Sequence, residues 1–252
     1  MHALKNKTVV ITGASAGIGR ALAFEFLRQG YHLGLSARRL DVLEALRTEL
    51  LTQALPQQRV ALARMDVDDA DDVDSGLQNL FEALGGADIV VVNAGINGFT
   101  RVGQPDFAQT RRLIQTNLLG AIATVDCAAR HMVERGGGQI VGISSLAGLQ
   151  AVPKQGAYCA SKAGFSMYLD AARLELQRKN VQVTKILPGF VVTDIMPKIA
   201  QYPFAVTAER AAAEIVRLVE KRVRVGAVPA YPWKWLRPLF GHFPDWLWRK
   251  LA

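Results

Sequence analysis

Short runs of β-branched and other apolar residues alternate, along most of this chain, with longer stretches whose apolar residues recur at helical spacing. The short runs are apolar almost throughout, as in strands that are buried on both faces of a sheet. Strands that alternate with helices form a parallel sheet covered by crossover helices on both faces. The expected strands are Thr8–Thr12, His32–Ser36, Val60–Met65, Ile89–Val92, Gln139–Ser144, Val181–Leu187 and Val223–Val228.

The expected helices fill the intervals between these strands. Their ranges are Ile18–Arg28, Leu40–Leu51, Asp69–Leu84, Phe107–Glu134 (as two helices), Ala157–Lys179 and Ala208–Arg222. A chain of 252 residues can bury the core of one large α/β domain, and no repeat or linker interrupts it. The sequence therefore predicts a single Rossmann-type domain with a doubly wound parallel sheet over residues 1–228. An aromatic and basic extension, residues 229–252, follows this domain.

Composition narrows the functional classes. Half of the residues are hydrophobic (50%) and 21% are charged, which is typical of a globular protein. Cys127 and Cys159 have neither disulfide nor metal spacing, and the four histidines have no metal spacing either, so we expect no metal and a reducing compartment. The formal charge of +8 is spread along the chain without a nucleic-acid motif, so nucleic acid is not an expected partner. No apolar signal segment or spanning stretch is evident, which predicts a cytoplasmic protein.

A glycine-rich segment, Thr12-Gly13-Ala14-Ser15-Ala16-Gly17-Ile18-Gly19, joins the first strand to the first helix. Glycines let the backbone turn tightly and approach a ligand closely, and the free N–H groups at a helix start bind phosphate. Such turns also serve packing alone, but this one follows the first strand of an alternating chain, which favours a dinucleotide site. The candidate contacts are Gly13, Ser15, Gly17, Ile18 and Gly19.

The second strand is followed by Arg38 and Arg39, and no acidic residue occurs before Asp41. An NAD site usually places an acid here for the ribose hydroxyls, whereas guanidinium groups suit the 2′-phosphate of NADP. The alternative is two solvated arginines at a helix start, where cations are mildly unfavourable. We therefore expect NADP(H), with Arg38 as the main contact and Arg39 as the second.

Tyr158 and Lys162 are four residues apart, so they share one face of the expected helix. A free tyrosine has a pKa of about 10 and is a weak base at neutral pH. A neighbouring ammonium favours the phenolate and lowers this pKa, which suits acid–base catalysis. Ser144 and Ser145 end a strand upstream, where a hydroxyl could meet a substrate oxygen.

With these features in order, the chain resembles the short-chain dehydrogenase/reductase family from Lys7 to Val228. The resemblance is carried by Thr12 to Gly19, Asp66-Val67, Asn93-Ala94-Gly95, Asn117, Ser144-Ser145, Tyr158-x-x-x-Lys162, and Pro188-Gly189 followed by Thr193. Any one of these motifs is common, but the ordered set is specific. In one departure, Val92 stands where the family often has a second asparagine.

The resemblance implies a role for each matching residue. Tyr158 would be the general acid in reduction and the base in oxidation, and Lys162 would lower its pKa and bind the nicotinamide ribose. Ser145 would polarise the carbonyl oxygen, and Asn117 would anchor a water in a proton relay. Further cofactor contacts would come from Asp66 and Val67 at the adenine, from Asn93, Ala94 and Gly95 at the adenosine ribose, and from Pro188, Gly189, Val191 and Thr193 at the nicotinamide. The family also implies a seven-stranded sheet and homodimers or homotetramers.

The leading functional hypothesis is NADPH-dependent reduction of a ketone or aldehyde on a lipophilic small molecule, such as a 3-ketoacyl or sphingoid-type lipid. An alcohol dehydrogenase that works toward oxidation is the alternative, and a non-catalytic NADP-binding protein is the third hypothesis. The segment from Gly189 to Thr207 is expected to form a mobile cover over the substrate, and its apolar residues indicate an apolar substrate.

All four tryptophans lie near the C-terminus: Trp233, Trp235, Trp246 and Trp248. Indoles interleaved with cations suit peripheral contact with a membrane interface. They also suit packing against the domain, a partner subunit or the substrate cleft. The segment is short and is broken by prolines, which favours packing.

Overall fold

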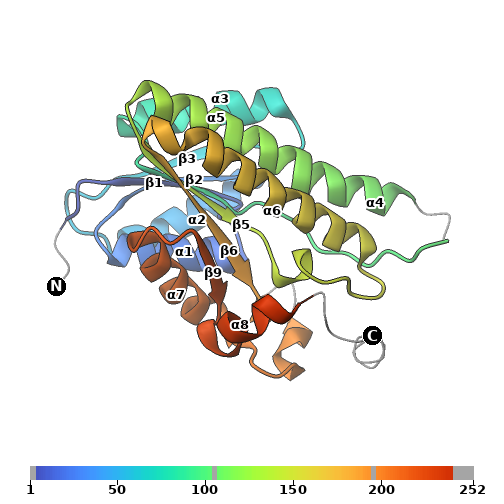
Figure 1. Cartoon of the computed structure of the whole chain (residues 1–252). Coiled ribbons are helices and arrows are strands. Elements are labelled where there is room, and N and C mark those ends of the chain that lie inside the picture. Colours follow the sequence, from blue (N-terminus) through green and yellow to red (C-terminus); the bar gives the residue numbers. More distant parts are fainter. Residues whose placement is uncertain (1–3, 104–106, 194–196, 241–252) are drawn as a thin grey trace.

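The computed structural model describes residues 4–103, 107–193 and 197–240. Seven parallel strands form one sheet in the order β3-β2-β1-β4-β5-β6-β9, with helices on both faces (Figure 1). The strands are β1 (Thr8–Thr12), β2 (His32–Ala37), β3 (Val60–Arg64), β4 (Ile89–Val92), β5 (Gly138–Ile143), β6 (Val181–Pro188) and β9 (Val225–Val228). The predicted Rossmann-type fold is confirmed.

The two faces of the sheet carry separate hydrophobic cores. On one face the apolar sides of α1 (Gly17–Arg28), α2 (Leu40–Leu51) and α7 (Ala208–Glu220) are buried in one core. On the other face α3 (Ala70–Leu84), α5 (Gly120–Glu134) and α6 (Gly156–Leu176) are buried in the second. The strands β1, β2 and β4 are buried at every residue, which explains why they are mostly apolar.

Shorter elements complete the described chain, most of them at the carboxyl end of the sheet and η3 at the amino end, just before β6. They are α4 (Phe107–Ile114), the π-helical turn η1 (Gln115–Leu119), η2 (Leu146–Gly148), η3 (Gln177–Lys179), η4 (Pro197–Gln201), α8 (Ala230–Leu236) and η5 (Arg237–Leu239). A two-stranded sheet, β7 (Val191–Val192) with β8 (Val206–Thr207), folds within the segment that was expected to cover the substrate.

Most of the expected element boundaries agree with the structure to within one or two residues. The expected pair of helices over Phe107–Glu134 is α4 and α5, but the π-helical turn η1 joins them without a break. The expected helix Ala157–Lys179 ends earlier, at Leu176, and continues as the 3-10 turn η3. Trp246 and Trp248 lie outside the described residues.

Candidate active site

The sheet register brings the segments that carry the candidate residues to one edge. Ile11 pairs with Val91, Val92 with Gly142, and Ile143 with Ile186. Because all these strands are parallel, the residues that follow β1, β2, β4, β5 and β6 emerge at the same carboxyl edge. In open α/β sheets this edge forms the ligand crevice.

The glycine turn after β1 is packed too closely to accept side chains. Gly13 and Gly17 have φ angles of 67° and 55°, in the region that favours glycine. A Cβ added to Gly13 would lie 2.7 Å from the Cα of Ala94, and one added to Gly19 would lie 2.3 Å from the carbonyl oxygen of Gly13. These glycines therefore carry no side chain that would cover the backbone of the turn at the crevice.

Hydrogen bonds from the next strand hold the turn in place. The Asn93 side-chain amide donates to the carbonyl oxygens of Thr12 and Gly13, at 3.0 and 3.1 Å. The Thr12 hydroxyl in turn accepts from the backbone N–H groups of Asn93 and Ala94. Asn93 thus holds the glycine turn in place. Thr12 shares this role, which the sequence reasoning did not assign to it.

The start of α1 is left open to an anion. Asp69 caps α3 and Thr207 caps α7 through their side chains, whereas Ala16 offers no side-chain cap to α1. The first turn of α1 also lacks an acidic residue, although α3 has Asp71 and Asp72 there. The first N–H groups of a helix need acceptors, and a phosphate supplies them.

Thr193 brings a later segment over the same turn. Its methyl carbon lies 3.2 Å from the position that a Cβ of Gly17 would occupy. Upstream of it, Pro188 ends β6, Gly189 donates its N–H to the carbonyl oxygen of Val228 at 2.8 Å, and Val191 is buried in β7. The segment after β6 and the glycine turn therefore face each other across the crevice.

Arg38 and Arg39 follow β2 and are exposed. No carboxylate in the described part of the chain forms an ion pair with either of them. Arg64 is also exposed and pairs in register with Ala37, so a third guanidinium borders this end of the crevice. Arg64 was missed from the sequence, since only the register of β3 with β2 brings it here. Arg64 also lies 3.5 Å from the Asp72 carboxylate.

Asn117 and Lys162 meet beside Gly95. A Cβ on Gly95 would lie 3.1 Å from the Asn117 side-chain oxygen and 3.5 Å from the Lys162 ammonium nitrogen. The Asn117 side chain is fully buried, accepts from the N–H of Ile96 and donates to its carbonyl oxygen, both at 2.8 Å. The Lys162 ammonium donates to the carbonyl oxygen of Ile143 at 3.0 Å.

The π-helical turn η1 carries Asn117, and such turns are frequent at functional sites. The loop after β3 anchors it: the Thr116 hydroxyl donates to the Asp68 carboxylate at 2.6 Å. Gly120 follows the turn, and a Cβ there would lie 2.2 Å from the carbonyl oxygen of Val67. Asp68 and Thr116 were not expected from the sequence, because their contact joins residues far apart in the chain.

The neighbouring residues Asp66 and Val67 lie in this anchoring loop. The Asp66 carboxylate accepts from the N–H of Asp68 at 3.2 Å, and the Asp66 N–H donates to the Asp72 carboxylate at 2.7 Å. The side chain of Asp66 thus shapes its own loop. This loop lies at the carboxyl end of β3, on the same edge of the sheet as Arg38.

The two serines after β5 differ in their contacts. Ser144 donates its hydroxyl to the carbonyl oxygen of Lys162 at 3.0 Å and lies 2.7 Å from the Ser166 hydroxyl, so it ties β5 to α6. Ser145 lies close enough to the Tyr158 phenol to lower its pKa, and the Ser145 hydroxyl accepts from the N–H of Ala147 at 3.1 Å. Of the two, Ser145 therefore belongs with Tyr158.

Burial sets the protonation of the two titratable groups. It raises the pKa of Tyr158 above its ordinary value, and Ser145 only partly opposes this. Burial also lowers the pKa of Lys162 to about 8. The sequence predicted a lowered pKa for Tyr158, and the structure reverses that direction. The reason is that desolvation of the phenol is the largest effect, while the ammonium is directed to the carbonyl of Ile143.

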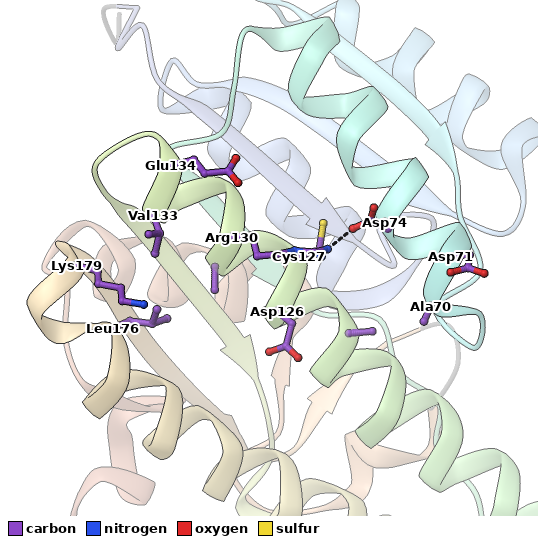
Figure 2. A pocket seen from close by; sticks show the side chains of 12 residues that line it. Ala70, Asp71, Asp74, Asp126, Cys127, Arg130, Val133, Glu134, Leu176 and Lys179 are labelled. Atoms are coloured by element: carbon purple, nitrogen blue, oxygen red, sulfur yellow. Dashed lines mark hydrogen bonds and ion pairs between the residues drawn. The ribbon is translucent and has the colours of Figure 1, made fainter.

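A separate hollow of about 870 Å³ lies away from this edge, among α3, α5 and the end of α6 (Figure 2). Charged side chains line it, including Asp74 and Arg130, which form an ion pair there, and Asp126. None of the candidate residues lines this hollow. Among the described residues, no cluster of three or more His, Cys, Asp or Glu side chains could hold a metal ion.

The family model described as short chain dehydrogenase matches residues 7–203. The chain belongs to this family. Short-chain dehydrogenases use NAD(P)(H) and act on CH–OH groups, so the chain is an oxidoreductase. The glycine turn after β1 and the uncapped start of α1 fit such a nucleotide. Arg38 and Arg39, which are exposed and have no carboxylate partner among the described residues, fit it too. Members are typically oligomeric and take small-molecule substrates.

Relatives in this family match nearly the whole chain. An uncharacterized oxidoreductase of Mycobacterium tuberculosis is 35% identical over 245 residues, which cover 97% of this chain and 96% of that protein. One from Myxococcus xanthus is 36% identical over 235 residues, covering 93% and 90%. The solved structure of an alcohol dehydrogenase from the archaeon Thermococcus sibiricus, complexed with 5-hydroxy-NADP, is 29% identical. It has a TM-score of 0.78 and covers 88% of this chain and 94% of that chain.

Among the described residues, none of the helices has the length and apolar character that a membrane-spanning helix requires.

Proposed function

We propose that this short-chain dehydrogenase reduces a ketone or aldehyde on a lipophilic small molecule with NADPH. The observation that carries the proposal is the meeting of Tyr158 with Ser145, beside Lys162 and Asn117, at the carboxyl edge of the sheet. The bound nicotinamide supplies the hydride. A 3-ketoacyl or sphingoid-type lipid is a substrate class that fits the apolar segment after Gly189.

The chain's own residues would handle the proton. Because burial raises the pKa of Tyr158, its phenol stays protonated at neutral pH, which is the form that donates a proton to a carbonyl oxygen. Ser145 would hold the same oxygen. The Lys162 ammonium would bind the nicotinamide ribose, and the buried amide of Asn117 would hold the Ile96 backbone beside it, next to a relay water. In the alternative, alcohol oxidation, the same phenol would first have to lose its proton.

Turnover by Tyr158→Phe tests this assignment. The variant loses only the phenol oxygen, so we expect NADPH-dependent ketone reduction to fall by about 10²-fold or more, as expected for the loss of a general acid. NADPH affinity, measured by fluorescence titration, should stay nearly unchanged. Tyr168→Phe, which removes a phenol from the outer part of the same helix, is the matched control. Substantial activity in Tyr158→Phe would contradict the role, and retained binding without any wild-type turnover would favour a non-catalytic protein.

We propose NADP(H) rather than NAD(H) as the cofactor. Arg38 and Arg39 are exposed, have no carboxylate partner among the described residues and follow β2, where a 2′-phosphate would lie. The phosphate and ribose contacts proposed from the sequence, including Ser15 and Ile18 on the glycine turn, adjoin the open start of α1. The relative that is complexed with 5-hydroxy-NADP is consistent with this choice.

The choice of cofactor can be measured directly. Arg38→Ala should weaken NADPH binding about tenfold, since a hydrogen-bonded charged contact is lost, and should leave NADH binding unchanged. Arg47→Ala, an exposed arginine on α2, serves as the control. If the wild-type protein bound both cofactors equally, the assignment to NADP would be wrong.

We further propose a homodimer or homotetramer in the cytoplasm, with residues 229–252 as an extension that completes the active site and touches membrane peripherally. The exposed apolar residues Met167 and Leu174 lie seven residues apart on α6 and offer a surface to a second copy.

Two tryptophans of the extension differ in exposure, which suits one to the active site and the other to the membrane. Trp233 is half-buried against Gly189, whereas Trp235 is 72% exposed.

A further inference from the structure

Six aromatic rings gather next to Gly189, at the carboxyl end of β6. They are Phe190, Tyr202, Phe204, Tyr231, Trp233 and Phe240. Trp233 is the centre of this aromatic cluster: its ring centroid lies 5.9 Å from Phe190 and 6.1 Å from both Phe204 and Phe240. The rings come from three segments that are distant in sequence, so the cluster joins α8 to the segment after β6.

The nitrogen-bearing edge of the Trp233 indole faces Gly189. A Cβ on Gly189 would lie only 2.6 Å from the indole nitrogen, so this contact requires glycine. Ser144 donates its N–H to the carbonyl oxygen of Ile186, so the serines after β5 and Gly189 after β6 follow adjacent parallel strands at the same edge of the sheet. The indole, which packs on Gly189, therefore lies at the end of the strand next to the one that leads to Ser145.

The indole N–H of Trp233 is buried and has no acceptor among the residues that the structure describes. Tryptophan N–H groups usually find a partner when they are buried, and an unsatisfied buried donor destabilises the fold. Phe204, which packs on Trp233, has a φ of 63°, a conformation that bulky residues rarely adopt. Two unfavourable features thus meet in one cluster beside the crevice, and such features concentrate where ligands bind.

We propose that Trp233 determines the substrate specificity of this active site. The inference rests on the proposed reductase function and, in place of the acyl and sphingoid-type chains named there, gives a ring-containing substrate class: a flat carbonyl compound that carries a second oxygen acceptor. The faces and edges of the aromatic cluster hold the apolar ring, and the Trp233 N–H donates a hydrogen bond to the second oxygen. A site built to donate to an oxygen discriminates strongly against an analogue that lacks it, because its buried donor then stays unpaired.

The test compares 2-tetralone derivatives that differ only in the acceptor. The 5-, 6-, 7- and 8-methoxy-2-tetralones present an ether oxygen at each ring position, and the corresponding methyl-2-tetralones have nearly the same shape without it. Dissociation constants are measured by calorimetry on the full chain with NADP⁺ present, and turnover is measured separately with NADPH. At least one methoxy compound should bind about tenfold more tightly than its methyl counterpart, which corresponds to ~1.4 kcal/mol.

Trp233→Phe keeps an aromatic ring and removes the donor, so it should abolish this preference and leave the methyl compounds almost unaffected. Trp235→Phe, which alters the exposed indole two residues away, should retain the preference. In a ¹H–¹⁵N spectrum of the wild-type protein, one indole N–H signal should move downfield with the preferred methoxy compound and not with its methyl counterpart. This measurement holds even if Trp233→Phe folds poorly.

Each result has a definite meaning. An unchanged preference in Trp233→Phe, the absence of any preference in the wild type, or the failure of every tetralone to bind would overturn the inference. It would also fail if Trp233→Phe weakened NADP⁺ binding alone, because the indole would then serve the cofactor. If the tetralones bound with the expected preference but none were reduced, the recognition site would stand and the proposed reductase function would be wrong.

Discussion

Lys162 and Lys185 are both buried, but their surroundings differ. The Lys185 ammonium forms an ion pair with the Asp170 carboxylate, whereas the Lys162 ammonium donates to the carbonyl oxygen of Ile143. A buried ammonium without a carboxylate partner is poorly compensated for its lost hydration, and the pKa of Lys162 is accordingly lowered to about 8. The buried Lys162 ammonium therefore lowers the stability of the free protein. It also places a positive charge at the crevice, where it can bind a nucleotide.

This cost predicts a pH dependence. The pKa of Lys162 is about 8 in the folded chain and 10.5 in the unfolded one. Between these pH values the unfolded chain binds more protons, so the contribution of Lys162 to stability rises with pH. The free energy of unfolding of Lys162→Met, minus that of the wild type, should therefore decrease from about pH 8 to about pH 10 in urea titrations. Lys221→Met, at an exposed position, should show a flat difference, and a flat difference for Lys162→Met would contradict the burial argument.

At the scale of elements, the π-helical turn η1 brings the α4–α5 helical segment into the site. An extra residue in one helical turn shifts the register between α4 and α5, and Asn117 lies within that turn. The Asp68 loop holds the turn from outside through Thr116 and through the side-chain amide of Gln115. Asn117 can then bind both backbone polar groups of Ile96. The position of the amide thus depends on a loop that follows β3.

Thr116→Val tests this dependence, since valine keeps the shape and removes the hydroxyl that reaches Asp68. We expect kcat to fall roughly tenfold, because Asn117 loses its fixed position, while NADPH affinity changes little. Stability should fall by ~1–2 kcal/mol, since a charge-assisted bond is lost. Thr124→Val is the matched control: its hydroxyl bonds to the carbonyl of Gly120 within α5, so it should leave kcat unchanged. Equal kcat values for both variants would show that Asp68 does not position the turn.

How much of this could be predicted from the sequence depends on the range of the interaction. Strands such as β4 were predicted to the residue, because burial on both faces leaves an uninterrupted apolar run. The turn η1 was not, since Gln115 to Leu119 has no pattern that separates a π-helix from an α-helix. The roles of Thr12 and Asp68 were missed for another reason. Each acts on a residue that only the folded sheet brings near, and the raised pKa of Tyr158 likewise follows from burial rather than from its spacing to Lys162.

At the scale of the whole molecule, the C-terminal extension has an inner and an outer side. Trp233 packs in the aromatic cluster beside Gly189, while the outward set, Trp235 and Leu239, is exposed at 72% and 50%. Lys234 lies over the Trp235 ring, and Arg237 follows. Aromatic residues mixed with cations suit an anionic bilayer surface, and the net charge of +8 acts in the same direction. A lipophilic substrate could then reach the crevice from the membrane side.

The full-length protein should therefore sediment with vesicles of phosphatidylglycerol and phosphatidylcholine at low salt, and less so with phosphatidylcholine alone. High salt should weaken the binding, because exposed charges are screened. The double substitution Trp235→Ser and Leu239→Ser should weaken it several-fold, since apolar area inserted into the interface is lost. Leu51→Ser removes a comparably exposed apolar residue from α2 and should have no effect. If the wild-type protein stayed in the supernatant, or if Leu51→Ser weakened binding as much as the double variant, the outward set would not be a membrane contact. The exposed residues would then be assigned to contacts between subunits.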